Sequence, residues 1–170
     1  MQWTWGAPGG QISELCYARQ WPKPVLLLAC CLVQLSCAFA TLDNVVQQDR
    51  QATTDEVERL HFVRQGQRLS PQVPLSLQRG DQISTDAETS VVIHFTTGTE
   101  VIVWPNSRIS IFSIRAFLGE LYVKARGLFR VETEYAVAGT EGTEFLITIS
   151  PNNEVSVIVV EGAVRIESTR

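Results

Sequence analysis

Cysteine is confined to the start of this chain. The four cysteines all lie ahead of residue 38, at Cys16, Cys30, Cys31 and Cys37. Their absence from the rest of the sequence excludes a disulfide framework, a thiolate metal site and a cysteine nucleophile there. The remainder is therefore suited to an oxidising compartment.

Positive charge is also scarce. The 14 Lys and Arg residues are outnumbered by 18 Asp and Glu, the formal net charge is −4, and the basic residues are scattered singly. Proteins that bind a phosphate backbone cluster their Lys and Arg side chains. We therefore expect no nucleic-acid partner.

Motifs for catalysis and metal binding are missing too. The two histidines, His61 and His94, stand apart among apolar neighbours, whereas a zinc site needs three or four convergent ligands. No serine lies in a GxSxG motif, and the glycines form neither GxGxxG nor a phosphate-binding loop. We expect no cofactor and no enzymatic activity.

Two groups of acidic residues are the remaining candidates for chemistry. On a strand Glu132 and Glu134 would share one face, as the carboxylates of a glycosidase do, although a solvated face commonly has the same spacing. Asp81, Asp86 and Glu88 are candidates for a calcium site, but their spacing matches no known calcium loop. We assign neither group a catalytic or metal-binding role.

The first 40 residues resemble an export signal. Arg19 and Lys23 precede an apolar run over residues 24–40 that ends in the small-x-small triplet Ala38-Phe39-Ala40. This pattern predicts a signal peptide over residues 1–40, cleaved before Thr41. An uncleaved membrane anchor is an alternative. So is a lipoprotein modified at Cys37, although Gln34 stands where that motif has an aliphatic residue.

The rest of the chain is long enough for one globular domain. With 45% hydrophobic and 19% charged residues in a chain of 170, a single core is expected. Residues 41–56 are polar and read as a linker or a short frayed helix. Residues 57–167 are predicted to form the domain.

Alternating apolar and polar residues dominate that domain. Strands buried on one face show this period of two, which the sequence has at residues 91–95, 108–114, 120–125, 129–132, 144–149, 155–159 and 164–167. Turn-forming Gly, Pro and Asn residues separate the strands every 8–12 residues or so. The pattern predicts an all-β domain of short strands and tight turns, either a β-roll or solenoid-like form or a sandwich.

Residues 101–104, Val-Ile-Val-Trp, are apolar on both faces. A central strand covered on two sides has this composition. A surface for a partner is the other interpretation, and Trp104 is then the candidate contact residue because aromatic side chains concentrate at interfaces.

Several separated segments resemble the FecR domain family. The family pattern GD.I.T is matched within residues 77–85, and DG(S/T)xVxLxPxS is matched by residues 97–107. The patterns GxLxV and FxVxT are matched at 119–123 and 129–133, AVAGxxGTEF at 136–145, and VxVxxGxVxI closes the domain. Two departures are Thr97 where the family usually has Asp, and Glu141 where it usually has Arg.

The motif residues are interpreted as folding devices. Glycines supply positive φ in turns, and short polar side chains bond to the nearby backbone. The residues assigned in this way are Gly80, Asp81, Thr85, Gly98, Pro105, Ser107, Gly119, Gly142, Thr143, Phe145 and Gly162.

The resemblance implies an exported protein of the periplasm or cell envelope that binds, senses or scaffolds without catalysis. Known FecR regulators carry a cytoplasmic anti-sigma segment and a C-terminal part that meets a transducer. This chain has short flanks, so we do not expect their role in transcription control. The expected partner is an envelope protein or glycan. The protein is expected to contact the membrane only if its N-terminal segment stays uncleaved. A structural spacer at the wall and an enzyme with an unrecognised carboxylate site remain alternatives.

Overall fold

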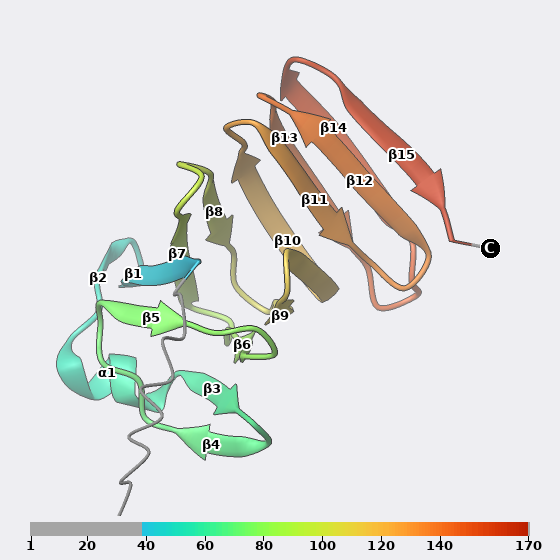
Figure 1. Ribbon diagram of the computed structural model, residues 1–170. Coiled ribbons are helices and arrows are strands. Elements are labelled where there is room, and N and C mark those ends of the chain that lie inside the picture. Colours follow the sequence, from blue (N-terminus) through green and yellow to red (C-terminus); the bar gives the residue numbers. More distant parts are fainter. Residues whose placement is uncertain (1–38, 170) are drawn as a thin grey trace, which may run out of the picture. The chain divides into compact units, whose positions relative to one another are not determined.

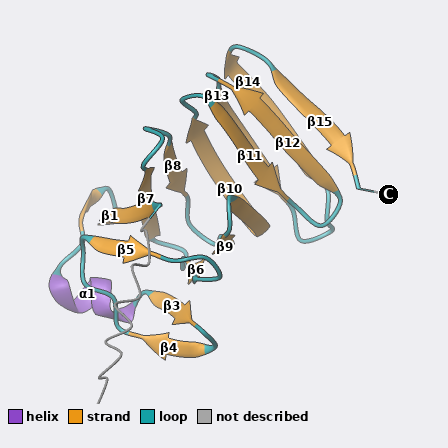
Figure 2. Cartoon of the chain, in the orientation of Figure 1, coloured by secondary structure: helices purple, strands orange, loops and turns teal. Residues whose placement is uncertain are grey.

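The computed structural model describes residues 39–169, and this part of the chain is nearly all β-strand (Figures 1 and 2). Its 15 strands form one curled sheet that is antiparallel apart from a single parallel pair. Within the described residues the only helix is α1 (Thr54–Arg59), and this part of the chain contains no helix that is long and apolar enough to cross a membrane. The expectation of an all-β fold is confirmed, whereas the expected signal or anchor lies outside the described residues except for Phe39 and Ala40.

The sheet curls into two layers that share the long strand β10 (Ile114–Lys124). The first layer runs in the order β2 (Arg50–Gln51), β1 (Ala40–Gln47), β7 (Thr89–Phe95), β8 (Glu100–Val103), β10, β13 (Glu144–Ile149), β14 (Val155–Glu161), with β5 (Leu75–Leu77) also on β1. The second layer runs in the order β4 (Gln67–Leu69), β3 (His61–Arg64), β6 (Gln82–Ser84), β9 (Arg108–Ile111), β10, β11 (Leu128–Glu132), β12 (Ala136–Glu141), β15 (Val164–Ser168).

Strand β10 changes layers at Gly119. Residues before this glycine pair with β9, and residues from Gly119 onward pair with β13 and, from Leu121, with β8. Gly119 has a φ of 99°, and a Cβ placed on it would lie 2.4 Å from the Cα of Ser107. A side chain at this position would therefore collide with the backbone of the turn that joins β8 to β9.

The core lies between the two layers and is built by the alternating residues. The inward side chains of β7, β10 and β13 are buried, among them Ile93, Leu121 and Phe145. They belong to one core cluster with Phe62, Ile109 and Ile111 of the second layer's strands. Burying a side chain of this size contributes about 1.5–3 kcal/mol relative to exposing it. The alternation is therefore the principal source of the fold's stability.

The structure differs from the linker expected at residues 41–56. Strand β1 pairs with both β5 and β7, and its side chains Leu42 and Val45 are buried. The register shifts between Leu42 and Asn44, which marks a bulge. Because a bulge adds one residue, the two inward residues are three apart and the period of two is hidden. The folded part thus begins at or before Ala40, not at residue 57.

The structure also differs from the sequence-based expectations about which strand faces are buried. Strand β8 is covered on one face only, since Ile102 is half-buried and Trp104, just beyond its end, is 41% exposed. On the last two strands the inward residues Val159 and Ile166 are exposed as well, whereas Val155, Val157 and Val164 are half-buried against the core. Both strands lie at sheet edges, so no further strand covers them.

A buried ion pair joins the second layer to the turn after β5. Asp81 is 1% exposed and accepts two hydrogen bonds from Arg64, from Nε at 2.9 Å and from a terminal nitrogen at 2.7 Å. The same carboxylate accepts the backbone N–H of Gln78 at 2.7 Å, and the pKa of Arg64 is raised mainly by its hydrogen bond to Asp81. The pair therefore fixes the turn around Gly80 against β3.

We predict that Asp81→Ala lowers the free energy of unfolding by about 3 kcal/mol, because it leaves a partly buried guanidinium without its carboxylate. Urea unfolding followed by circular dichroism measures this change. The control is Lys124→Ala, which breaks the more exposed Lys124–Glu144 pair and should cost much less, because solvent screens an exposed ion pair. Equal costs for the two variants would contradict the role assigned to Asp81.

Candidate functional site

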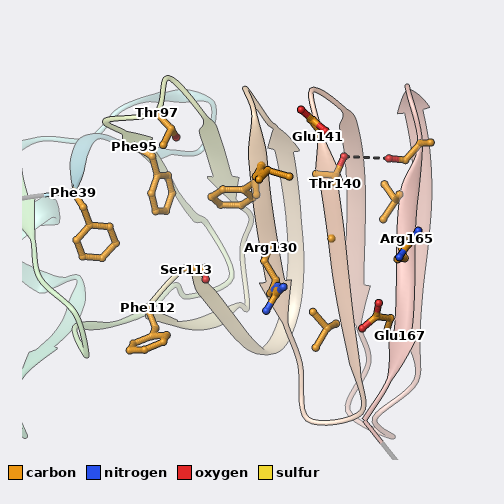
Figure 3. Close-up of a pocket in the computed structure, with 16 residues that line it drawn as sticks. Phe39, Phe95, Thr97, Phe112, Ser113, Arg130, Thr140, Glu141, Arg165 and Glu167 are labelled. Carbon is orange, nitrogen blue, oxygen red and sulfur yellow. Dashed lines mark hydrogen bonds between the residues drawn. The ribbon is translucent and has the colours of Figure 1, made fainter.

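A groove of about 1000 Å³ opens on the outer face of β11, β12 and β15. Figure 3 shows Phe39, Phe95 and Phe112 on one side of it, and Arg130 and Arg165 on the strands at the other. One wall is therefore aromatic, whereas the strand face carries charged residues.

The aromatic wall is a chain of touching rings. The centroids of Phe39 and Phe95 are 6.1 Å apart, and Phe95 meets Phe129 edge-on at 5.0 Å. The guanidinium of Arg79 lies 4.9 Å from the ring centroid of Phe112 and 6.0 Å from that of Phe39. Contacts of this kind hold rings in place, so the wall is a preformed apolar surface.

The strand face places two arginines on either side of a glycine. In the β-ladder Arg130 of β11 pairs with Gly139 of β12, and Gly139 pairs with Arg165 of β15. Paired residues point to the same face of a sheet. A Cβ at Gly139 would have no neighbour within 4 Å, so the space between the two guanidinium groups is open.

Neither arginine forms an ion pair with any residue in the part of the chain that the structure describes. The neighbouring rows of the same face carry Glu141 beside Leu128, and Glu167 beside Val137. Leu128 is 80% exposed. The groove thus offers guanidinium donors, carboxylate acceptors and apolar contact within one surface.

This arrangement suits binding of an extended ligand that has both apolar and charged groups. Recognition sites are largely apolar with a few placed polar groups that fix orientation. Arg side chains in such a site bind carboxylates through paired hydrogen bonds. The described residues contain no group of three His, Cys, Asp or Glu placed to hold a metal ion.

Away from the groove, His94 links two acidic residues on the first layer. Its Nδ1 lies 2.6 Å from a carboxylate oxygen of Asp43, and its Nε2 lies 2.8 Å from one of Glu100. The hydrogen bond to Glu100 is the largest cause of a raised pKa at His94; Asp43 also raises it and partial burial opposes it. The charged imidazole can donate to both carboxylates at once.

We predict that this cluster makes stability depend on pH. Because the folded state raises the pKa of His94, its contribution is complete below the unfolded value of 6.5 and is lost as pH rises through the folded value. Unfolding midpoints of the wild type should therefore fall as the pH rises above 6.5, more steeply than those of His94→Gln. Identical pH profiles would rule out the cluster as the cause.

The glycines singled out from the sequence lie in turns or at ladder irregularities. Gly80, Gly98, Gly119, Gly142 and Gly162 all have positive φ. Gly162 is also crowded, because a Cβ there would lie 2.8 Å from the Oγ1 of Thr143.

The polar motif residues bond to the backbone of neighbouring turns. The Oγ1 of Thr85 donates to the carbonyl of Trp104 at 2.7 Å and accepts the N–H of Ser107 at 2.9 Å. Thr143 donates to the carbonyl of Ala163 at 3.0 Å. Pro105 is half-buried in the turn before β9, and Phe145 is fully buried.

None of the motif residues assigned from the sequence lines the groove, and Trp104 does not line it either. The groove residues were missed because they come from three strands whose register cannot be read from one sequence. A partial signal existed, since the alternation placed Arg130 and Arg165 outward on their strands. Only the ladder through Gly139 brings them together.

The acidic residues singled out from the sequence do not line the groove, and they do not form a shared catalytic or metal site. Glu132 ends β11, whereas Glu134 lies in the following loop and not on the strand. Asp81 is bound to Arg64, and Asp86 accepts the N–H of Glu88 at 3.0 Å in its own turn. His61 is exposed at the start of β3.

Comparison with known families gave one match. The family model described as FecR protein matches residues 81–165, which is half of the chain. No curated protein and no solved structure matches. The matched range contains β11, β12 and the start of β15, and so most of the strand face of the groove.

Proposed function

The chain belongs to the FecR protein family, and on that premise we propose that it is an exported, non-catalytic binding or sensing module of the cell envelope. The groove on β11, β12 and β15 is its binding site. The partner is an envelope protein or glycan that presents an apolar group together with a carboxylate.

The groove is the observation that carries this proposal. Its aromatic wall contains the ring contact of 5.0 Å between Phe95 and Phe129, and its two arginines flank an open glycine. Rigid aromatic side chains and arginines contribute most of the free energy at protein interfaces. The apolar surface and the hydrogen-bond donors of the groove are suited to a protein partner and to a glycan partner.

Export would change the groove directly. Cleavage before Thr41, as the sequence predicts, removes Phe39, whose ring packs on Phe95 and whose carbonyl accepts the N–H of Thr96 at 3.0 Å. Phe95, Phe112 and Phe129 then form the aromatic wall without it. The mature protein would therefore have a wider groove than the precursor.

Two exposed phenylalanines provide a matched test. Phe112 is 56% exposed and Phe117 is 44% exposed, and each ring lies near an arginine, Arg79 and Arg115 respectively. Only Phe112 lines the groove. We predict that Phe112→Ala weakens capture of the envelope partner about tenfold, as for loss of one interface anchor, whereas Phe117→Ala leaves it unchanged.

The measurement is quantitative pull-down from envelope extracts with the two variants and wild type as baits. Arg130→Glu combined with Arg165→Glu should also reduce capture, and Arg108→Glu, an exposed arginine outside the groove, serves as their control. Partners retained equally by wild type, Phe112→Ala and the double arginine variant would exclude the groove as the binding site.

A further inference from the structure

The last strands of the two layers end at the same side of the molecule, and both are edges (Figure 1). Strand β14 pairs only with β13, and β15 pairs only with β12, among the strands that the structure describes. An edge strand presents a row of unpaired backbone N–H and C=O groups to any strand that can approach it.

Exposed apolar side chains gather on these two strands. Ile158, Val159 and Val160 of β14 are exposed, and so is Ile166 of β15, at 54%. Natural edges are usually protected by lysine, proline or an inward charge. Strand β14 has none of these, and its one charged residue, Glu161, lies at its end.

Strand β15 is complementary in charge to a second copy of itself. Its central residues are Arg165, Ile166 and Glu167, and all three are exposed. If two copies pair antiparallel about a two-fold axis at Ile166, Arg165 of each lies opposite the partner's Glu167. Centring the pair on Arg165 or on Glu167 instead places like charges opposite each other, which is unfavourable.

We propose that this edge binds a second copy of the chain, with β15 paired to β15 in the register centred on Ile166 and β14 extending the other layer towards the partner. The contact is isologous, so it closes into a dimer and does not propagate. It covers the exposed residues of both edge strands and pairs their free backbone groups. Arg165 and Glu167 also line the groove proposed above, whereas Ile166 and the residues of β14 do not.

A cysteine at the two-fold axis tests the register. Residues directly opposite in an antiparallel pair have Cα atoms about 4.5–5.5 Å apart, within the range that a disulfide spans. The four native cysteines are first replaced by serine in the full chain. Ile166→Cys is then compared with Leu69→Cys, which places an exposed thiol on β4. Strand β4 is the edge strand at the opposite end of the same layer.

Mild oxidation should link Ile166→Cys into a covalent dimer on a non-reducing gel and leave Leu69→Cys monomeric. Because both variants keep the same N-terminal segment, association through that segment affects them equally. Absence of the Ile166→Cys dimer, or equal linkage in both variants, would overturn the proposal.

Charge reversal tests the pairing without a cysteine. Arg165→Glu and Glu167→Arg each turn two attractive cross-strand pairs into repulsive ones, and each should raise the dimer dissociation constant about tenfold. The double variant restores both pairs with their signs exchanged and should dimerise like the wild type.

Sedimentation of the full chain in detergent measures these constants, with circular dichroism to confirm that each variant is folded. A wild type that stays monomeric would contradict the proposal. So would a double variant that is no better than the single ones, or an edge that takes up only unrelated extended peptides.

Discussion

The close approach of Gly119 to Ser107 is the constraint on which the rest of the structure depends. It is the point where β10 stops pairing with one layer and starts pairing with the other. The hydroxyl of Ser107 accepts the N–H of Glu120 at 3.0 Å, and Thr85 in turn accepts the N–H of Ser107. These bonds satisfy backbone N–H groups at the bend of β10, where pairing between strands alone leaves them without a partner. The two layers are thereby held in contact.

The start of β10 explains why a groove forms beside β11. Strand β10 pairs with β11 only at Ile114 and Arg115, opposite Val131 and Glu132. Because this pairing is parallel, the first half of β11 lies opposite the turn of residues 112–113 that precedes β10, so no strand that the structure describes pairs with it on that side. Phe129 lies in that half and meets Phe95 there. The place of the aromatic wall therefore follows from the position at which β10 begins, and the arginine face follows from the ladder of β11, β12 and β15.

The strands and the family were predictable because both depend on local pattern. Alternation at residues 91–95 and 144–149 identified two central strands, and the motifs around Gly80 and Gly142 identified the FecR family. Strand β1 was missed because its bulge after Leu42 breaks the period. The arginine pair was missed for a different reason: it depends on which strands are neighbours, and this is decided by tertiary packing. The same holds for Trp104: the sequence shows that the strand ends in an apolar residue, but only tertiary packing decides whether another layer covers it.

The most direct test of this account compares alanine at two glycines with positive φ. Gly66 has a φ of 77° and open space around it, whereas Gly119 has a φ of 99° and faces the backbone of Ser107. Both substitutions carry the backbone cost of about 1–2 kcal/mol, but only Gly119→Ala also forces β10 away from the turn between β8 and β9. Urea unfolding should show Gly66→Ala folded with a small loss, and Gly119→Ala destabilised by more than about 3 kcal/mol or unfolded. Equal losses at the two positions would contradict the claim that this contact sets the fold.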